Sequence, residues 1–307
     1  MAMKFLQKIA FLIIFCWLAG PLQAQDDLMD LLNEMEEETT DYTYATFKSV
    51  RIVNAHTIET PAAGVLQMII SHRFGRINGG AYELFGLDQA NIRIGLEYGV
   101  TDWLNLGVGR SNVNKTYDGF LKMKLLRQSK GKRTMPITAT WLSNIAINTL
   151  KWQDPTRENY YSSRLAFTHQ LMVARKFSER FSLQVMPTVV HRNLVATPEE
   201  ENDVFAIGGG GRFKLTPGVS INAEYFYLLP GHTADNFTNS LSMGFDIETG
   251  GHVFQLIFTN SLGMTENLFI PGTSGEWKLG DIHFGFNISR VFTVSKKGRK
   301  APKGEGW

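Results

Sequence analysis

Residues 91–110, NIRIGLEYGVTDWLNLGVGR, decide how this sequence folds. Apolar residues from Ile92 to Tyr98 alternate with polar residues or glycine, and the same alternation resumes from Leu104 to Val108. Thr101–Asp102 lies between the two halves and predicts a turn. Because successive side chains of a β-strand point to opposite faces, the stretch predicts a hairpin whose strands each have one apolar face. That face packs either on a protein core or on lipid.

The same alternation recurs from Gly64 almost to the end of the 307-residue chain. Most of the segments that carry it have about ten residues or more, whereas strands of soluble proteins cluster near five or six. Twelve strands are predicted, over residues 64–75, 90–99, 103–113, 116–128, 135–148, 160–177, 181–195, 203–215, 218–229, 239–249, 251–260 and 280–293. Pro187 falls inside one of them and predicts a bulge there.

Tight and longer connections alternate between these strands. The tight ones are Val100–Asp102, Ser129–Arg133, Ser178–Arg180, Thr216–Gly218 and Thr249–Gly250; the longer ones are 76–89, 113–116, 149–159, 196–202, 230–238 and 261–279. Short periplasmic turns with longer external loops are typical of outer-membrane barrels. A membrane also demands closure, because an open sheet edge leaves backbone groups without partners. The prediction is an all-β, antiparallel transmembrane barrel of about 12 strands in the cell outer membrane, with lipid against its apolar face. A periplasmic β-sandwich with the same alternation is the alternative.

The two ends of the chain differ from this pattern. Residues 1–24 have Lys4 and Lys8 before an apolar run and a small residue at Ala24, which predicts an export signal peptide. Residues 25–63 form an acidic leader and an N-terminal extension or plug. Its β-prone part, 42–56, alternates poorly, and a thirteenth wall strand is the alternative for it. Residues 64–293 make the barrel, and 294–307 a basic periplasmic tail.

Composition excludes several function classes. Without Lys4 and Lys8 the chain has equal numbers of basic and acidic residues, and it is predicted to be exported, so no nucleic-acid partner is expected. The single cysteine, Cys16, lies in the signal peptide, which leaves no thiolate chemistry or disulfide. The histidines match no metal-ligand spacing, and the glycine run 207–212 lies in a strand without a following helix. We expect no enzyme, no cofactor and no metal.

The polar face of the strands carries charge of both signs. By parity we expect ten side chains to line the lumen: Arg73, Arg93, Glu97, Lys122, Lys124, Arg164, Arg192, Arg212, Glu224 and Asp246. Such charges either line a water-filled path and tune ion preference or pair with one another and fill the interior. Basic members outnumber acidic ones, so a pore would have a mild preference for anions.

The predicted external loop 261–280 is unusually apolar. It contains Leu268, Phe269, Ile270 and Trp277. Exposed apolar residues of this kind mark a binding surface or a segment that folds away from water. We expect the four residues to fold into the mouth of the lumen as a constriction, with partner binding as the alternative.

Two blocks of sequence also carry a resemblance. HRFGRINGGAYELFGLDQANIRIGLEYGVTDWLNLGVGR, followed by KTYDGFLKMKLLRQ, resembles an uncharacterised family of outer-membrane β-barrel proteins typical of the Bacteroidota. PGHTADNFTNSLSMGFDIETGGHVFQLIFTNSLGMTENLFIPGT is similar to the same family. The resemblance covers about Phe47 to Phe292 and implies the barrel and its location. It brings no activity and no site residues.

Two functions follow from these observations. The first is a narrow channel or transporter that passes small polar solutes or ions. The second is a filled structural barrel that anchors periplasmic proteins through its acidic leader and basic tail.

Overall fold

The computed structural model describes residues 39–295. The predicted signal peptide, most of the acidic leader and nearly all of the basic tail lie outside these residues. Two short strands, β1 (Thr40–Tyr42) and β6 (Ser129–Gly131), pair with each other in a sheet of their own.

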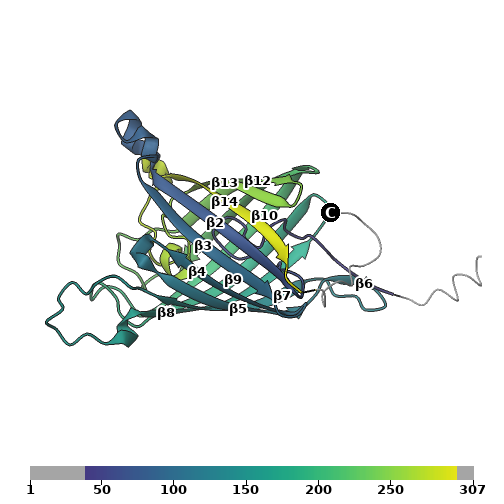
Figure 1. Ribbon diagram of the computed structural model, residues 1–307, viewed down its shortest axis with the longest axis horizontal. Coiled ribbons are helices and arrows are strands. Elements are labelled where there is room, and N and C mark those ends of the chain that lie inside the picture. The colour runs from purple at the N-terminus through teal and green to yellow at the C-terminus, as the bar shows by residue number, and fades with distance from the viewer. Residues whose placement is uncertain (1–38, 296–307) are drawn as a thin grey trace, which may run out of the picture. The chain divides into compact units, whose positions relative to one another are not determined.

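Twelve antiparallel strands close into a barrel, as the alternation in the sequence predicts (Figure 1). Each strand pairs with its neighbours in chain order, and the last pairs with the first. The strands are β2 (Val65–Arg76), β3 (Ala90–Gly99), β4 (Leu104–Ser111), β5 (Tyr117–Leu126), β7 (Thr138–Ile147), β8 (Leu165–Lys176), β9 (Phe181–Arg192), β10 (Asp203–Thr216), β11 (Val219–Leu228), β12 (Ser240–Thr249), β13 (His252–Thr259) and β14 (His283–Thr293).

The hairpin β3–β4 answers the question its sequence poses. Leu106 and Val108 are 47% and 59% exposed on the outside of the barrel, whereas Asn105, which directly precedes Leu106, is fully buried inside. A closed sheet with an apolar outer face and a polar inner face matches a barrel that spans the outer membrane with lipid around it.

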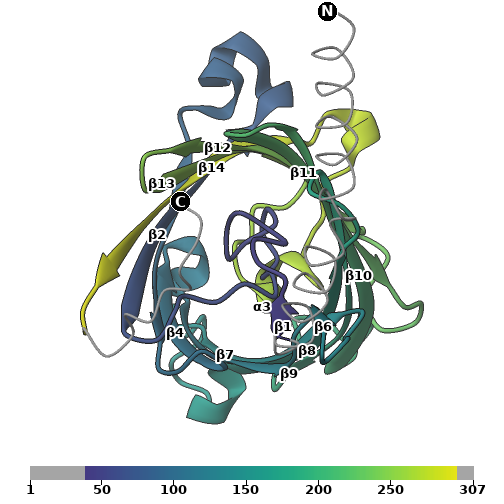
Figure 2. The ribbon, with the colours of Figure 1, turned by 90° about the vertical axis from the view of Figure 1, so that its right-hand side faces the viewer.

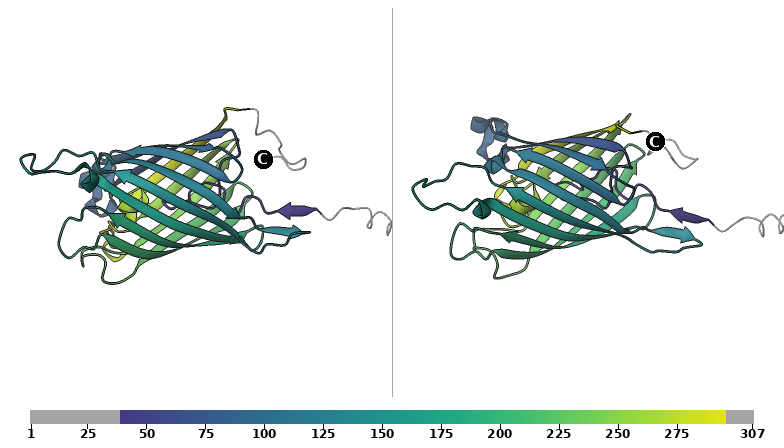
Figure 3. Two further views of the ribbon diagram at one scale, coloured as in Figure 1. Left: turned by 90° about the horizontal axis from the view of Figure 1, so that it is seen from below. Right: turned by 60° about the horizontal axis from the view of Figure 1, so that its bottom comes forward.

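Connections of different length gather at opposite ends of the barrel (Figure 3). At one end lie the turns 100–103, 177–180, 217–218 and 250–251; at the other lie the loops 77–89, 112–116, 148–164, 193–202, 229–239 and 260–282. The chain reverses at the predicted tight turn Ser129–Arg133, where Ser129 and Met135 exchange two backbone hydrogen bonds, but the predicted strands do not run up to it. The connection between β5 and β7 runs from 127 to 137 and contains β6, whose pairing with a distant segment local sequence does not reveal.

The long loops contain the helical turns η1 (Ile77–Gly86), η2 (Val113–Lys115), η3 (Tyr161–Arg164), α3 (Glu266–Phe269) and η4 (Trp277–Leu279). None of the helices within residues 39–295 has the length and apolar character needed to cross a membrane.

Pro187 produces no bulge. The register between β9 and β10 continues unbroken through Pro187 and Ile207. On the other side of β9, Leu171 and Met172 of β8 have no paired residue on β9. The register is nevertheless unshifted when pairing resumes between Val173 and Val185. Proline thus interrupts one ladder without inserting a residue, because it lacks only the donor that would face β8.

Residues 43–63 form a plug, and its central part, residues 46–58, is enclosed by the barrel (Figure 2). Phe47, Ile52, Val53 and Ile58 are each at most 4% exposed, and they share an apolar cluster with inward side chains of the wall such as Met186. The plug belongs to no barrel strand, so the alternative of a thirteenth wall strand is wrong. A segment that contacts protein on all sides has no polar face, which explains why its sequence alternates poorly.

Candidate functional site

The plug is held chiefly through its backbone. The Glu224 carboxylate on β11 accepts hydrogen bonds from three consecutive backbone N–H groups, those of Val53 (3.1 Å), Asn54 (2.8 Å) and Ala55 (3.0 Å). A carboxylate is acceptor-only and suits a turn whose amides point the same way. Glu224 is therefore the central anchor of the plug.

Further anchors come from the neighbouring strands. Gln184 of β9 accepts from the Ile58 amide and donates to the His56 carbonyl, and Gln255 of β13 donates to the carbonyls of Arg51 and Ile52. Further side-chain bonds to the plug include Arg73 to Asn54 Oδ1, Asn54 to Ser242, Asn287 to the Val53 carbonyl, Arg212 to the Ala45 carbonyl, Lys122 to the Glu59 carbonyl and Lys176 to the Tyr44 carbonyl. Most anchors thus come from β9 through β14 and from β2, with single bonds from β5 and β8.

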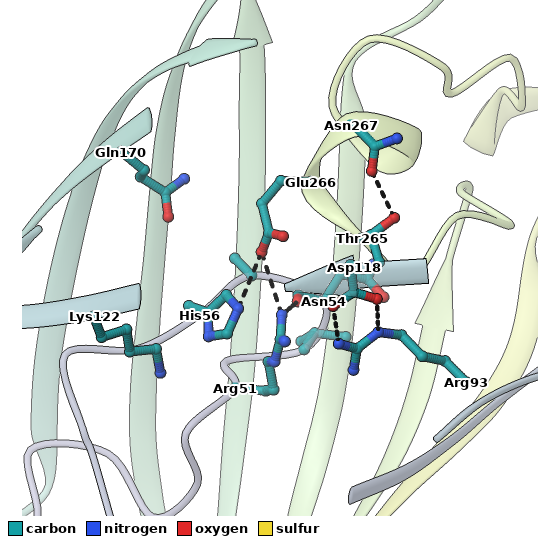
Figure 4. Close-up of polar contacts among 12 residues, drawn as sticks. Arg51, Asn54, His56, Arg93, Asp118, Lys122, Gln170, Thr265, Glu266 and Asn267 are labelled. Atoms are coloured by element: carbon teal, nitrogen blue, oxygen red, sulfur yellow. Dashed lines mark hydrogen bonds and ion pairs between the residues drawn. The ribbon is translucent and has the colours of Figure 1, made fainter. Parts of the chain in front are cut away.

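A cluster of buried charges lies where the plug meets the external loop 260–282 (Figure 4). Arg51 of the plug lies 3.2 Å from Glu266 of α3 and 3.9 Å from Glu97 of β3. Lys122 of β5 lies 3.7 Å from Glu97, and all four side chains are at most 5% exposed. Beside them Arg93 binds Asp118 through two nitrogens. The opposite charges compensate one another inside the barrel, as buried ions require.

His56 occupies the middle of this cluster. Its Nε2 lies 3.6 Å from Glu266 and its Nδ1 3.9 Å from Glu97, both beyond hydrogen-bond distance. The ring packs edge-on against Phe120, with 4.5 Å between centroids. Burial, reinforced by the positive charges of Arg51 and Lys122, lowers the pKa of His56 well below 6.5. The imidazole is therefore neutral, and the cluster is held by Arg51 and Lys122.

The wall from β3 to β8 holds more unpartnered polar atoms than the anchored half, where Arg73 Nε, Asn222 Oδ1 and Ser240 Oγ are also buried without a partner in the described chain. Several of its inward side-chain atoms are buried and, within residues 39–295, have no hydrogen-bond partner. They are the carboxylate oxygens of Glu97, both amide atoms of Asn105 and of Asn144, the hydroxyls of Thr140 and Thr168, and Oε1 of Gln170. Each buried polar group without a partner destabilises the fold by about 1–3 kcal/mol, so the arrangement of this half of the interior is energetically unfavourable.

A cavity of about 900 Å³ opens at the end of the barrel that carries the long loops. Residues of the loop 260–282, among them Leu262, Asn267 and Leu268, form part of its lining, as do strand ends that carry Arg76 and Arg192. We call this cavity the vestibule. Beneath the loop, the plug and the inward side chains of the wall fill the barrel.

The ten residues expected in the lumen occupy three places. Arg164 and Arg192 line the vestibule, and Lys124 is part-buried toward the end with short turns. The other seven are at most 4% exposed inside the barrel: Arg73, Arg93, Glu97, Lys122, Arg212, Glu224 and Asp246. They contact the plug, one another or neighbouring polar side chains, as in the 2.8 Å bond from Gln255 to Asp246.

The four apolar loop residues separate in the structure. Phe269 and Ile270 are fully buried, and Phe269 packs edge-on against Phe226 of β11 with 5.2 Å between ring centroids. Leu268 lines the vestibule. Trp277 is half-buried, and its indole donates to the Leu241 carbonyl at the end of β12. Trp277 therefore binds the rim of the wall.

Sequence reasoning missed the residues that the plug and loop contribute, namely Arg51, Asn54, His56 and Glu266. The one sequence signal was the stretch 42–56, which alternates poorly and has a charged residue among apolar ones. Such a pattern is unusual in a solvated leader. Among residues 39–295 no group of three or more His, Cys, Asp or Glu side chains is placed to hold a metal ion.

Comparison with solved structures finds other barrels of low identity. The NanC porin has 6% sequence identity and a TM-score of 0.46, with 74% of this chain and 98% of that chain covered. An outer membrane channel from Pseudomonas putida F1 has 12% identity and a TM-score of 0.44, over 76% and 97% of the two chains. The KdgM porin has 6% identity and a TM-score of 0.44, over 75% and 99%.

No curated protein matches the sequence. One family profile does, over residues 47–292, which are the plug and the whole barrel. With its closed ring of apolar-faced strands, the chain belongs to the family described as membrane bound beta barrel domain (DUF5777).

Proposed function

We propose that this protein is a gated, narrow channel or transporter for small polar solutes or ions, and that the plug and the loop 260–282 are its gate. The observation that carries the proposal is the uneven interior. Most hydrogen bonds to the plug come from β9–β14 and β2. The inward side chains of β4, β7 and β8 instead include several buried polar groups that lack partners within the described chain, although Lys176 at the end of β8 donates to the Tyr44 carbonyl.

These polar groups favour a second arrangement of the interior. If the plug shifts away from β4, β7 and β8 while it stays bonded to Glu224, water reaches the amides and hydroxyls of that wall and satisfies them. The gain offsets part of the cost of breaking apolar contacts beneath the loop. A polar, hydrated wall is the lining that small polar solutes need.

A substitution pair tests this directly. Thr168→Val replaces a buried hydroxyl without a partner, whereas Thr188→Val removes a hydroxyl that accepts from Gln170 and donates to the Met186 carbonyl. In planar bilayers T168V is expected to lower the open probability. The closed state would no longer bury an unpartnered hydroxyl at position 168, and the open wall would lose a polar group. T188V, the matched control, is expected to destabilise the fold without that selective loss.

The wider test compares the wild-type protein with a variant that lacks residues 25–60. Liposome swelling with small neutral sugars should be slow for the wild type and fast for the variant. If neither preparation passes sugar or current, the channel proposal fails.

A second candidate is the filled structural barrel. The apolar cluster that joins the plug to Phe226, Met172 and Met186 favours it, because such packing resembles a permanent core. Under this candidate the two ends of the chain engage periplasmic proteins. Removal of residues 25–60 would then abolish binding of those proteins and leave permeability unchanged.

A further inference from the structure

The vestibule is a cavity large enough to hold a small solute. Its volume of about 900 Å³ falls within the range of small-molecule binding pockets. Arginine side chains contribute to its lining from three strand ends, at Arg76, Arg164 and Arg192. Their charges decide which solutes it holds.

Arg164 is fixed in place without a carboxylate. Its guanidinium lies 3.7 Å from the ring centroid of Trp152, and its Nη1 donates to the carbonyls of Asn148 (2.8 Å) and Leu150 (2.6 Å). Among the described residues it takes part in no ion pair, whereas Arg76 pairs with Asp281. Carbonyl oxygens and an aromatic face orient a guanidinium but leave its full charge available.

Arg192 stands beside it on the next strand. The ladder between β8 and β9 pairs Arg192 with Ala166, two residues beyond Arg164. Nη1 of Arg192 binds Glu200 at 2.7 Å and Nη2 donates to the Glu201 carbonyl. Its Nε is buried and, within residues 39–295, has no partner. The guanidinium of this vestibule-lining residue therefore keeps a buried donor that the described residues do not satisfy.

A hydroxyl adds to the same lining. Thr116, just before β5, lines the vestibule, and its buried Oγ1 also lacks a partner in the described part of the chain. The acidic side chains of the lining are Glu83 and Glu200, and Glu200 is already engaged by Arg192. An oxyanion satisfies guanidinium donors and a hydroxyl together, and guanidinium–oxyanion bonds are among the stronger hydrogen bonds in proteins.

We propose that the vestibule holds the anionic group, carboxylate or phosphate, of a small polar solute between Arg164 and Arg192. This inference deepens the proposed function, because it names the solute class that such a gate would admit. The site itself requires only the vestibule as the structure has it.

The test is binding to the full-length processed protein in detergent. Trp152 lies under the Arg164 guanidinium, so its fluorescence reports a ligand at that charge. The probes are glucuronate for a carboxylate, inorganic phosphate for a phosphate, and glucose as an uncharged sugar of similar size. Glucuronate or phosphate, or both, should change the fluorescence and release heat on titration. Glucose should do neither.

Variants assign the signal. Arg164→Gln should weaken binding of the anionic probe at least tenfold, and Arg164→Lys should restore part of it because the charge returns without the planar fork. Arg175→Gln is the matched control, since Arg175 lies on the outer face at the opposite end of β8, over Phe177. It should leave binding unchanged, and Trp152→Phe should remove the fluorescence signal but retain the heat.

Each result decides something. Equal binding of glucose and glucuronate, or unchanged anion binding in R164Q, overturns the vestibule site. Binding depends on no current through the barrel, so anion binding without conductance refutes the channel and leaves the site. Conductance without anion binding refutes the site and leaves the channel.

Discussion

Arg51 and Glu266 meet inside the barrel although they lie 215 positions apart in sequence. Nη1 of Arg51 donates a hydrogen bond of 3.2 Å to Oε1 of Glu266. Arg51 belongs to the plug and Glu266 to the loop at the opposite end of the chain. The pair thus ties the segment that fills the barrel to the loop that lines its mouth. Motion of either segment requires the other to release a buried charge.

This pair should be strongly coupled in stability. Arg51→Gln or Glu266→Gln alone leaves a buried charge without its partner and should cost about 3–5 kcal/mol, whereas the double variant should lose much less than the sum. Urea unfolding in detergent measures the cycle. The pair Lys176–Glu179, in which the Glu179 side chain is 85% exposed, serves as control, with a coupling of about 0–1 kcal/mol. Additive losses at 51 and 266 would show that the pair does not join the two segments.

The anchor at Glu224 predicts a different result. Glu224→Gln keeps the shape of the side chain but removes one acceptor oxygen and all of its charge, so three backbone bonds of the plug weaken. We expect a loss of about 2–3 kcal/mol from weakened bonds to a charged group, with faster proteolysis of residues 43–63. Glu179→Gln should change neither measurement. Unchanged protection of the plug in E224Q would contradict its role as the anchor.

Lipid contact predicts a dependence on depth along the strands. Val185 is 51% exposed near the middle of β9, and Leu215 is 46% exposed near the end of β10. Val185→Arg should destabilise the protein folded in vesicles by about 2–4 kcal/mol, whereas Leu215→Arg should destabilise it by about 0–1 kcal/mol. Reversible folding into lipid vesicles gives both values. Equal costs at the two depths would mean that hydrocarbon does not surround β9.

The loop 260–282 should respond to acid through Asp281. Hydrogen bonds from the Asn78 side chain and the Glu276 amide, with Arg76 nearby, hold the pKa of Asp281 below 3.8. A depressed pKa means that the contribution to stability is full above the ordinary value and is lost as pH falls through the lower one. The hydrogen-exchange protection factors of residues 276–282, which correct for the intrinsic pH dependence of exchange, should therefore fall below about pH 3.8 and stay constant above pH 5. In the Asp281→Asn variant the amides of residues 276–282 should exchange faster than in the wild type at pH 7. The loss of protection below about pH 3.8 should then be absent.

Strand positions and facing were readable from the sequence because one physical rule governs them. Lipid outside and polar contacts inside impose a period of two on every wall strand, and the hairpin 91–110 displays it clearly. The same rule placed Arg93, Glu97 and Lys122 on the inner face.

What fills the interior was not readable. Arg51 and His56 lie in a segment enclosed on all sides, where no periodic pattern marks a buried residue. Their partner Glu266 comes from a loop more than two hundred residues away, and only the closed ring brings the two together. The length of the connection 127–137 was missed for a related reason, since β6 pairs with the distant β1, although the chain reverses where the turn was predicted.

The seam between β2 and β14 has a consequence for biogenesis. The plug immediately precedes β2, and Gly64 between them accepts hydrogen bonds from the amides of Val294 and Ser295 that follow β14. The ring is complete only when residues 283–293, the last of the wall strands to be synthesised, reach 65–76. The plug is therefore present before the wall closes. The forming sheet curls around this segment, which is already attached to the first wall strand, β2.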